Sequence, residues 1–232
     1  MTRQGFGGRL PDDAWRKLLQ AGATRRYSDG QTIISQGDRD TAVFLLASGT
    51  VKITTVRPDG EQVLLALRGP GEALGELSAL SGLPRTATVV AAGGACLTRV
   101  LSSDRFRALA REMGTEGALW QHVVTRQAES EALRAEMATL PSAQRLAAML
   151  LRTVALIGHD VDPAPAGHGG RHAVTIRLGL SQRELGDSVG LSRTSVAAEF
   201  ARLRSIGVVR TGRRFVAILD VGRLREIAEG AV

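Results

Sequence analysis

A glycine-rich stretch with one acid and one arginine offers the clearest chemistry in the first half of the chain. Residues 71–90 read GEALGELSALSGLPRTATVV. Gly75 allows a close backbone approach, and Glu76 can begin a short helix whose amides point at an anion. Arg85 then adds a cation, and Thr86 adds a hydroxyl and an amide. Together these groups could hold a phosphate, with the carboxylate left for a sugar hydroxyl.

Two helix-start signals follow one another in the second half of the chain. Ser181 and Glu184 have the spacing of a capping box, and Ser192 can cap the next helix. A short turn containing glycine separates the two helices, which is typical of a helix-turn-helix. Two short β-runs, 207–209 and 215–219, then surround a basic tip and predict a wing. The alternative is a small α/β domain that merely contains such a pair of helices.

Positive charge is concentrated in the same part of the sequence. The chain carries a net charge of +7, and its only lysines are Lys17 and Lys52. Residues 171–219 contain 9 Arg and 3 acidic residues, a balance of +6. Because arginine pairs with phosphates, this excess favours a polyanionic partner. A solvated basic surface is the plainer interpretation.

The elements that must position these residues can be read from hydrophobic spacing. Between residues 25 and 100, short apolar runs alternate with glycines and predict an all-β sandwich, barrel or roll. Short helices are expected on either side, at residues 11–21 and 103–112. The apolar runs are 32–34, 43–46, 51–56, 63–67, 86–90 and 96–100.

Residues 115–137 are expected to form a long helix, because they lack proline and are rich in helix formers. Within them, residues at alternating steps of four and three form a heptad-like seam, which predicts pairing with a second copy of the chain. A single packing helix is the alternative. Two polar members would cost stability unless they face a ligand or fix the register. The seam comprises Leu119, Val123, Arg126, Ser130, Leu133 and Met137.

Pro141 marks a boundary, and a further helix is expected through residues 145–154. The following loop, 158–172, is rich in glycine and proline. Its histidines have no compact zinc-site spacing and no thiol nearby, so we predict a solvated loop and no metal site. They are His159, His168 and His172.

Several classes of protein can be set aside. Cys96 is the only cysteine, so an internal disulfide or a cysteine-ligated cluster is excluded. We find no secretion signal and no apolar run long enough to span a bilayer, and therefore expect a cytoplasmic protein without membrane contact. The absence of a nucleophile elbow, a Walker loop or a metal signature predicts that the chain is not an enzyme.

The segment LSQRELGDSVGLSRTSVAAEFARLRSIGVV resembles the helix-turn-helix of the CRP/FNR (catabolite activator protein, cyclic-AMP receptor) family of bacterial transcription regulators. The glycine-rich stretch is similar to the phosphate-binding cassette of cyclic-nucleotide domains, and the resemblance covers nearly the whole chain. It implies an α+β fold with an N-terminal cyclic-nucleotide-binding β-roll, a long dimerisation helix and a C-terminal winged helix-turn-helix. We place these parts at residues 1–112, 113–138 and 139–232. The implied partners are a near-palindromic double-stranded DNA operator, a second copy of the chain and RNA polymerase.

The resemblance implies that Glu76 binds a ribose 2′-hydroxyl and Arg85 the cyclic phosphate. Ser130 falls where relatives contact adenine, but Glu131 departs from the pattern and weakens the case for cAMP. We therefore expect cAMP or another cyclic nucleotide as an allosteric effector, with no obligatory cofactor. The alternatives are a regulator with a vestigial or different effector pocket, and a nucleotide-sensing module that acts through a protein partner. The predicted ligand-binding residues are Gly75, Glu76, Leu77, Arg85, Thr86 and Ser130.

The resemblance also places the second helix of the pair in the DNA major groove. Arg193 matches the family's base-reading arginine, a side chain suited to the O6/N7 edge of guanine. Thr194 and Ala198 stand where many relatives carry Glu and a second basic residue, so we expect an unusual operator. Arg210 is expected to contact phosphate. The predicted DNA-binding residues are Ser181, Gln182, Ser192, Arg193, Thr194, Ser195, Ala198, Arg202, Arg213 and Arg214.

Overall fold

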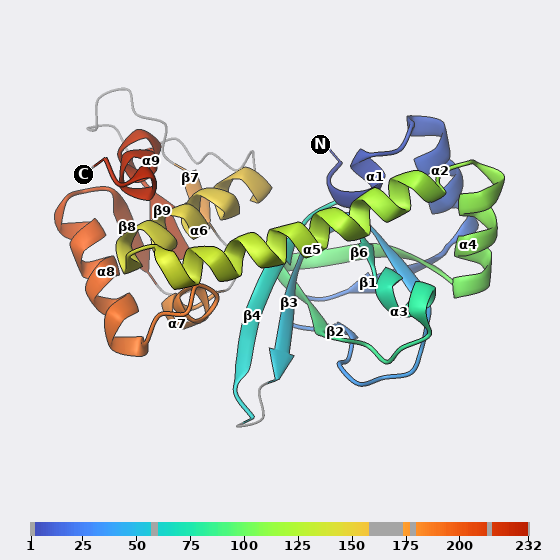
Figure 1. Cartoon of the computed structure of the whole chain (residues 1–232), viewed down its shortest axis with the longest axis horizontal. Helices are drawn as coiled ribbons and strands as arrows, with labels where there is room; N and C mark the ends of the chain where they lie inside the picture. Colours follow the sequence, from blue (N-terminus) through green and yellow to red (C-terminus); the bar gives the residue numbers. More distant parts are fainter. Residues whose placement is uncertain (1–2, 57–59, 158–173, 177–179, 213–214, 232) are drawn as a thin grey trace. The chain divides into compact units, whose positions relative to one another are not determined.

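The computed structural model describes residues 3–56, 60–157, 174–176, 180–212 and 215–231. The chain divides into two compact units, Met1–Glu131 and Ala132–Val232. Both mix helix and sheet, as the sequence predicts. The long helix α5 (Glu116–Thr139) begins in the first unit and ends in the second (Figure 1).

The first unit is built on a six-stranded antiparallel sheet. Four strands run in the order β1-β6-β3-β4, while β2 pairs with β6 and β5 pairs with β3. The strands are β1 (Ala23–Tyr27), β2 (Thr32–Ile34), β3 (Val43–Val56), β4 (Gln62–Arg68), β5 (Ala73–Leu74) and β6 (Thr88–Leu101).

Strands β3 and β6 are longer than the sequence predicts, because each joins two of the apolar runs. In β3 the pairing register with β6 shifts between Leu46 and Thr50, and Gly49 between them has φ +87°. A β-bulge absorbs an extra residue without ending the strand, and glycine adopts this backbone readily. Gly49 therefore marks a bulge where the sequence suggested a turn.

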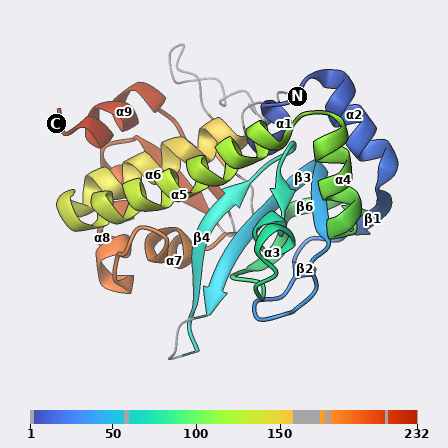
Figure 2. The same cartoon turned by 45° about the vertical axis from the view of Figure 1, so that its right-hand side comes forward.

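Three helices cover one end of the roll: α1 (Gly5–Gly8), α2 (Asp12–Ala21) and α4 (Ser103–Glu112). They gather around the first turns of α5 in both views (Figures 1 and 2). Helices α2 and α4 confirm the sequence prediction, whereas α1 was not predicted. The buried apolar side chains of this end include Phe6, Trp15, Leu18, Phe106, Leu109 and Leu119.

This packing corrects the predicted seam of α5. Leu119 is only 4% exposed and belongs to the roll's own core, so it is not available to a second copy. Arg126 turns toward the roll, where it pairs with Glu72. The large apolar side chains that α5 leaves exposed are Trp120, at 62%, and Val124, at 63%. The exposed apolar face therefore begins one residue later than the heptad pattern suggested.

In the described residues of the second unit, the end of α5 and four further helices pack with a three-stranded antiparallel sheet of order β7-β9-β8. Strand β7 and helix α9 were not predicted, and the histidines of the loop 158–172 lie outside the described residues. No helix in the described part of the chain is both long and apolar enough to cross a membrane. The elements are α6 (Ser142–Ile157), β7 (Val174–Ile176), α7 (Gln182–Asp187), α8 (Arg193–Ser205), β8 (Val209–Gly212), β9 (Phe215–Ile218) and α9 (Val221–Glu229).

Candidate functional site

The glycine-rich stretch folds into a tight turn between β5 and the short helix α3 (Glu76–Ser81). Gly75 stands at this turn with φ +80°, and a Cβ atom there would overlap the guanidinium of Arg85. Glycine is needed at this position for its backbone conformation and for the space it leaves. The turn thus seats Arg85 directly against the start of α3.

Arg85 is 4% exposed and held by backbone carbonyls. Its Nη1 donates to the Gly75 oxygen at 2.8 Å, and its Nη2 donates to the Ala42 oxygen at 2.6 Å. Asp40 lies close, with Oδ2 3.6 Å from Nη2. Because a guanidinium has five N–H donors, these contacts fix its orientation and leave donors for another ligand.

The other predicted ligand residues are placed differently. Glu76 is 8% exposed and begins α3 beside Gly75. Leu77 and Thr86 are exposed, and Ser130 is half-buried on α5. The turn therefore brings together Gly75, Glu76 and Arg85, while the remaining three residues lie on its surface or on the helix.

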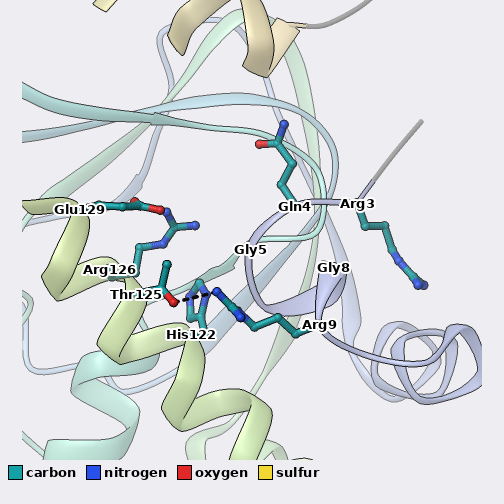
Figure 3. A pocket seen from close by; sticks show the side chains of 9 residues that line it. All are labelled: Arg3, Gln4, Gly5, Gly8, Arg9, His122, Thr125, Arg126 and Glu129. Carbon is teal, nitrogen blue, oxygen red and sulfur yellow. Dashed lines mark hydrogen bonds and ion pairs between the residues drawn. The ribbon is translucent and has the colours of Figure 1, made fainter. Parts of the chain in front are cut away.

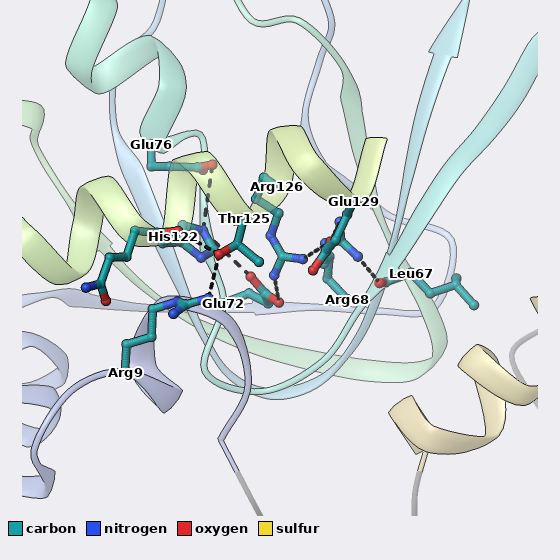
Figure 4. A network of polar contacts seen from close by, with 10 residues as sticks. Arg9, Leu67, Arg68, Glu72, Glu76, His122, Thr125, Arg126 and Glu129 are labelled. Carbon is teal, nitrogen blue, oxygen red and sulfur yellow. Dashed lines mark hydrogen bonds and ion pairs between the residues drawn. The ribbon is translucent and has the colours of Figure 1, made fainter. Parts of the chain in front are cut away.

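A chain of ionic contacts joins the roll to α5 (Figure 4). Glu72 is 2% exposed and pairs with Arg126. The Arg126 guanidinium also contacts Glu129 at 2.6 Å, and Arg68 contacts the same Glu129 carboxylate at 3.2 Å. A buried carboxylate without a partner would cost several kcal/mol, so Arg126 is what makes the burial of Glu72 tolerable.

His122 lies in the middle of this network as a neutral side chain. It is 2% exposed, and its Nε2 is 3.9 Å from both Glu72 Oε2 and Glu76 Oε1. Burial, followed by the charges of Arg126 and Arg9, lowers the pKa of His122 to about 3. At neutral pH the imidazole is uncharged. These two contacts are therefore not ion pairs, although both distances are short enough for one.

Glu76 has the opposite kind of perturbation. Burial raises the pKa of Glu76 to about 7, and the neighbouring Glu72 carboxylate adds to the rise. The Glu76 carboxyl is therefore partly protonated near neutral pH. A carboxylate accepts hydrogen bonds best when ionised, so the role predicted for Glu76 requires it to lose this proton.

A separate polar cavity of about 270 Å³ lies between the N-terminal segment and α5 (Figure 3). None of the predicted ligand residues lines it. It meets the ionic network at His122, Arg126 and Glu129, which belong to both. The lining residues are Arg3, Gln4, Gly5, Gly8, Arg9, His122, Thr125, Arg126 and Glu129.

Sequence reasoning missed Glu72 and His122 as parts of this region. The signal for Glu72 was weak: one acid next to a short apolar pair, in a stretch already assigned to phosphate binding. Arg126 carried a clearer signal, since a polar residue in an apolar seam demands a partner. The structure supplies that partner within the same chain, as the Glu72 carboxylate.

The helix-turn-helix is assembled as the sequence predicts. Ser181 Oγ accepts from the Glu184 amide, and Glu184 Oε2 accepts from the Ser181 amide at 2.9 Å, which completes the capping box. Helices α7 and α8 cross closely at Gly186, where a Cβ atom would come within 2.6 Å of the Val196 side chain. The close crossing depends on glycine at this position.

Helix α8 buries one face and exposes the other. Ser192 caps it by accepting from the Ser195 amide at 3.1 Å. Its inner residues are Val196, Phe200 and Leu203, each at most 3% exposed. The predicted DNA-contacting residues that it exposes, together with its cap, are Ser192, Arg193, Thr194, Ala198 and Arg202.

The remaining predicted DNA-binding residues surround this face. Ser181 is exposed and Gln182 is partly exposed at the start of α7, and Ser195 is half-buried in the first turn of α8. Arg213 and Arg214 lie outside the described residues. Strands β8 and β9 pair antiparallel around them and confirm the two strands of the wing. In the described part of the chain, no cluster of three or more side chains could hold a metal ion.

Comparison with known proteins assigns both units. Residues 24–113 match the family model for a cyclic nucleotide-binding domain, and residues 144–227 match that for a Crp-like helix-turn-helix domain. A cyclic AMP receptor protein of Thermus thermophilus is 30% identical over 207 residues, covering 89% of this chain and 88% of the relative. A CRP-like cAMP-activated global transcriptional regulator of Mycobacterium tuberculosis is 28% identical over 201 residues, covering 85% and 84%.

A solved structure of a CRP/FNR family transcriptional regulator from Thermus thermophilus superposes with a TM-score of 0.69 at 25% identity. The match covers 89% of this chain and 98% of that chain. These relatives are transcription regulators and not enzymes, in agreement with the sequence prediction. The chain belongs to the CRP/FNR family of DNA-binding transcription regulators and combines a cyclic nucleotide-binding domain with a Crp-like helix-turn-helix.

Proposed function

We propose that this regulator binds DNA as a homodimer and that a cyclic nucleotide in its β-roll controls this binding, with cAMP as the first candidate. The observation that carries the proposal is the turn in which Arg85 is seated against Gly75 at the start of α3. An arginine fixed in this way meets a phosphate without first losing side-chain freedom, and charge-assisted hydrogen bonds to phosphate are strong. Two relatives are named for cAMP, which supports the choice of nucleotide.

The ribose contact in this proposal involves Glu76. A 2′-hydroxyl donates to the ionised carboxylate, whereas the free protein holds this carboxyl partly protonated. Binding is therefore expected to release a proton from Glu76. The affinity for the nucleotide should rise as the pH increases through about 7.

A vestigial or different effector pocket is the second candidate. In its favour, Arg85 already satisfies two carbonyls and lies near Asp40. Glu131, at the second position where relatives contact the base, is exposed and accepts from Gln127 instead. Under this alternative the fold and the DNA binding persist, but the response to nucleotide is lost.

Calorimetric titration of cAMP and cGMP separates the two candidates. We expect saturable binding to the full chain, and a loss of several kcal/mol in Arg85→Ala because the phosphate loses its cation. Glu76→Ala should lose less, since a single sugar contact disappears. The matched control is Arg16→Ala, an exposed arginine on α2. No binding by either protein would favour a vestigial pocket, and equal binding by wild type and Arg85→Ala would favour a different one.

We place the dimer contact on the exposed face of α5. Trp120 and Val124 lie one helical turn apart there, and desolvating a tryptophan side chain at an interface is strongly favourable. Half-buried Leu133 and Met137 remain from the predicted seam. Sedimentation at micromolar concentration should give a dimer for wild type and a shift toward monomer for Trp120→Ala. A wild-type monomer with and without DNA would refute this assignment.

We propose that α8 reads DNA in the major groove through Arg193. A dimer presents two such helices to a near-palindromic site, with the half-sites one helical turn apart. Thr194 and Ala198 offer a hydroxyl and methyl groups, which read bases weakly. RNA polymerase as a partner stays a prediction from the family.

A further inference from the structure

We infer that the cavity between the N-terminal segment and α5 is a second ligand site, which binds a small organic polyanion through carboxylate or phosphate groups. This site is distinct from the turn that carries Arg85, because the two share no lining residue. The inference does not depend on the nucleotide proposed for the roll.

The cavity is an open hollow close to the size of a small-ligand site. Its volume of about 270 Å³ lies just below the range for ligand pockets. His122, 2% exposed, lies at the inner side of the cavity, and exposed Arg9 lies toward solvent. Figure 3 shows the side chains of His122, Thr125 and Arg126 on α5 facing the segment that carries Gln4 and Arg9.

The charge of the lining favours an anion. The guanidiniums of Arg9 and Arg126 border the cavity beside the one carboxylate of Glu129, and that carboxylate is already shared between Arg126 and Arg68. The Arg3 guanidinium turns away and contacts Asp12 and the Leu10 carbonyl. A ligand with acidic groups would therefore meet more donors than acceptors.

Arg9 is the cation best placed to bind such a ligand. Arg126 is engaged by Glu72 and Arg3 by Asp12, whereas Arg9 donates to a neutral group, Thr125 Oγ1, at 2.7 Å. Among the described residues, no carboxylate lies within ion-pair distance of Arg9. A charged ligand can replace the Thr125 hydroxyl and gain a charge-assisted hydrogen bond that the free protein lacks.

The site can be tested by calorimetry on the full chain at constant ionic strength, with citrate and inorganic phosphate as the probes. Arg9→Gln removes the cation at an exposed position and leaves the roll core intact. We expect at least one probe to bind wild type saturably and its Kd to rise at least tenfold in Arg9→Gln, because hydrogen bonds to charged groups contribute about 1.5–3 kcal/mol. Citrate binding alone would indicate a carboxylate ligand, and phosphate binding alone a phosphorylated one.

Two matched controls locate the binding. Arg16→Gln removes an exposed arginine on α2, and Arg85→Gln removes the arginine proposed for the nucleotide. Arg16→Gln should keep the wild-type affinity for either probe, and Arg85→Gln should keep it for citrate, because phosphate alone also fits the turn that carries Arg85. The inference is overturned if neither probe binds at about 10 mM, where a Kd of 1 mM would be saturating. It is equally overturned if Arg9→Gln binds like wild type, or if Arg85→Gln alone loses binding.

Discussion

The candidate sites of the two units differ in where their charges lie. In the roll, Glu72, Glu76 and Arg85 are each less than a tenth exposed as whole residues. On α8, Arg193 and Thr194 project into solvent from a helix whose opposite face is buried. A buried charge must be neutralised within the chain, so changing it alters stability and pKa values. An exposed charge has water as its partner, so its loss should affect binding and leave the fold nearly unchanged.

The largest effect should come from Arg126→Ala. This change leaves the Glu72 carboxylate buried without its partner, and the free energy of unfolding should fall by about 3–5 kcal/mol. Urea denaturation measures the change. The double variant Arg126→Ala with Glu72→Gln should recover part of the loss, because the uncompensated charge is gone. A loss below about 1 kcal/mol would mean that the roll does not depend on this pair.

Glu76→Gln should change how the free energy of unfolding depends on pH. The pKa of Glu76 is raised in the folded state from 4.5 to about 7, so the unfolded chain gives up this proton first as the pH rises. Stability is therefore lost progressively between about pH 4.5 and 7 in wild type, but not in the glutamine variant. The variant should match wild type near pH 4 and exceed it by about 3 kcal/mol at pH 8. Parallel pH profiles for both proteins would show that Glu76 is not buried as an acid.

Gly186→Ala should show that the helix-turn-helix also depends on packing. The added methyl group would press on the Val196 side chain where α7 and α8 cross. Overpacking of this kind costs about 1–3 kcal/mol, and it should weaken DNA binding by displacing α8. Thermal unfolding and DNA titration measure the two effects. Ala197→Gly, on the exposed face of α8, is the control for a change in helix propensity without a change in packing.

Arg193→Ala should have the smallest effect on stability, within about 0.5 kcal/mol, and a specific effect on DNA. We expect a loss of about 1–3 kcal/mol in binding and a relaxed preference at one base pair. Arg210→Ala, an exposed arginine of β8, should weaken all sequences alike and flatten the salt dependence by about one unit. Binding-site selection at two salt concentrations compares the DNA motifs and the salt dependence of the two variants. If Arg193→Ala selects the same DNA motif as wild type, α8 is not the helix that recognises the bases.

The same contrast explains what the sequence could predict. The helix-turn-helix could be predicted from residues that are close in sequence. Such residues form both the capping box of Ser181 and the buried face of α8. The turn at Gly75 also follows from local composition. The family resemblance then orders the units.

Contacts between residues far apart in the chain could not be predicted from the sequence. Glu72 and Arg126 are 54 residues apart, and nothing local pairs them. Leu119 fits a heptad as well as it fits the roll core, so periodicity alone could not decide which surface it covers. The cavity near Arg9 depends in addition on α1, a short helix of four residues without a propensity signal.

The most direct test of nucleotide-controlled DNA binding is fluorescence anisotropy with an operator obtained by selection. The Kd for DNA is measured with and without saturating cAMP, for wild type and Arg85→Ala. We predict that cAMP tightens binding by wild type at least about tenfold and leaves Arg85→Ala unchanged, since an effector shifts affinity by its coupling free energy. The same DNA affinity in wild type with and without the nucleotide would contradict cAMP control.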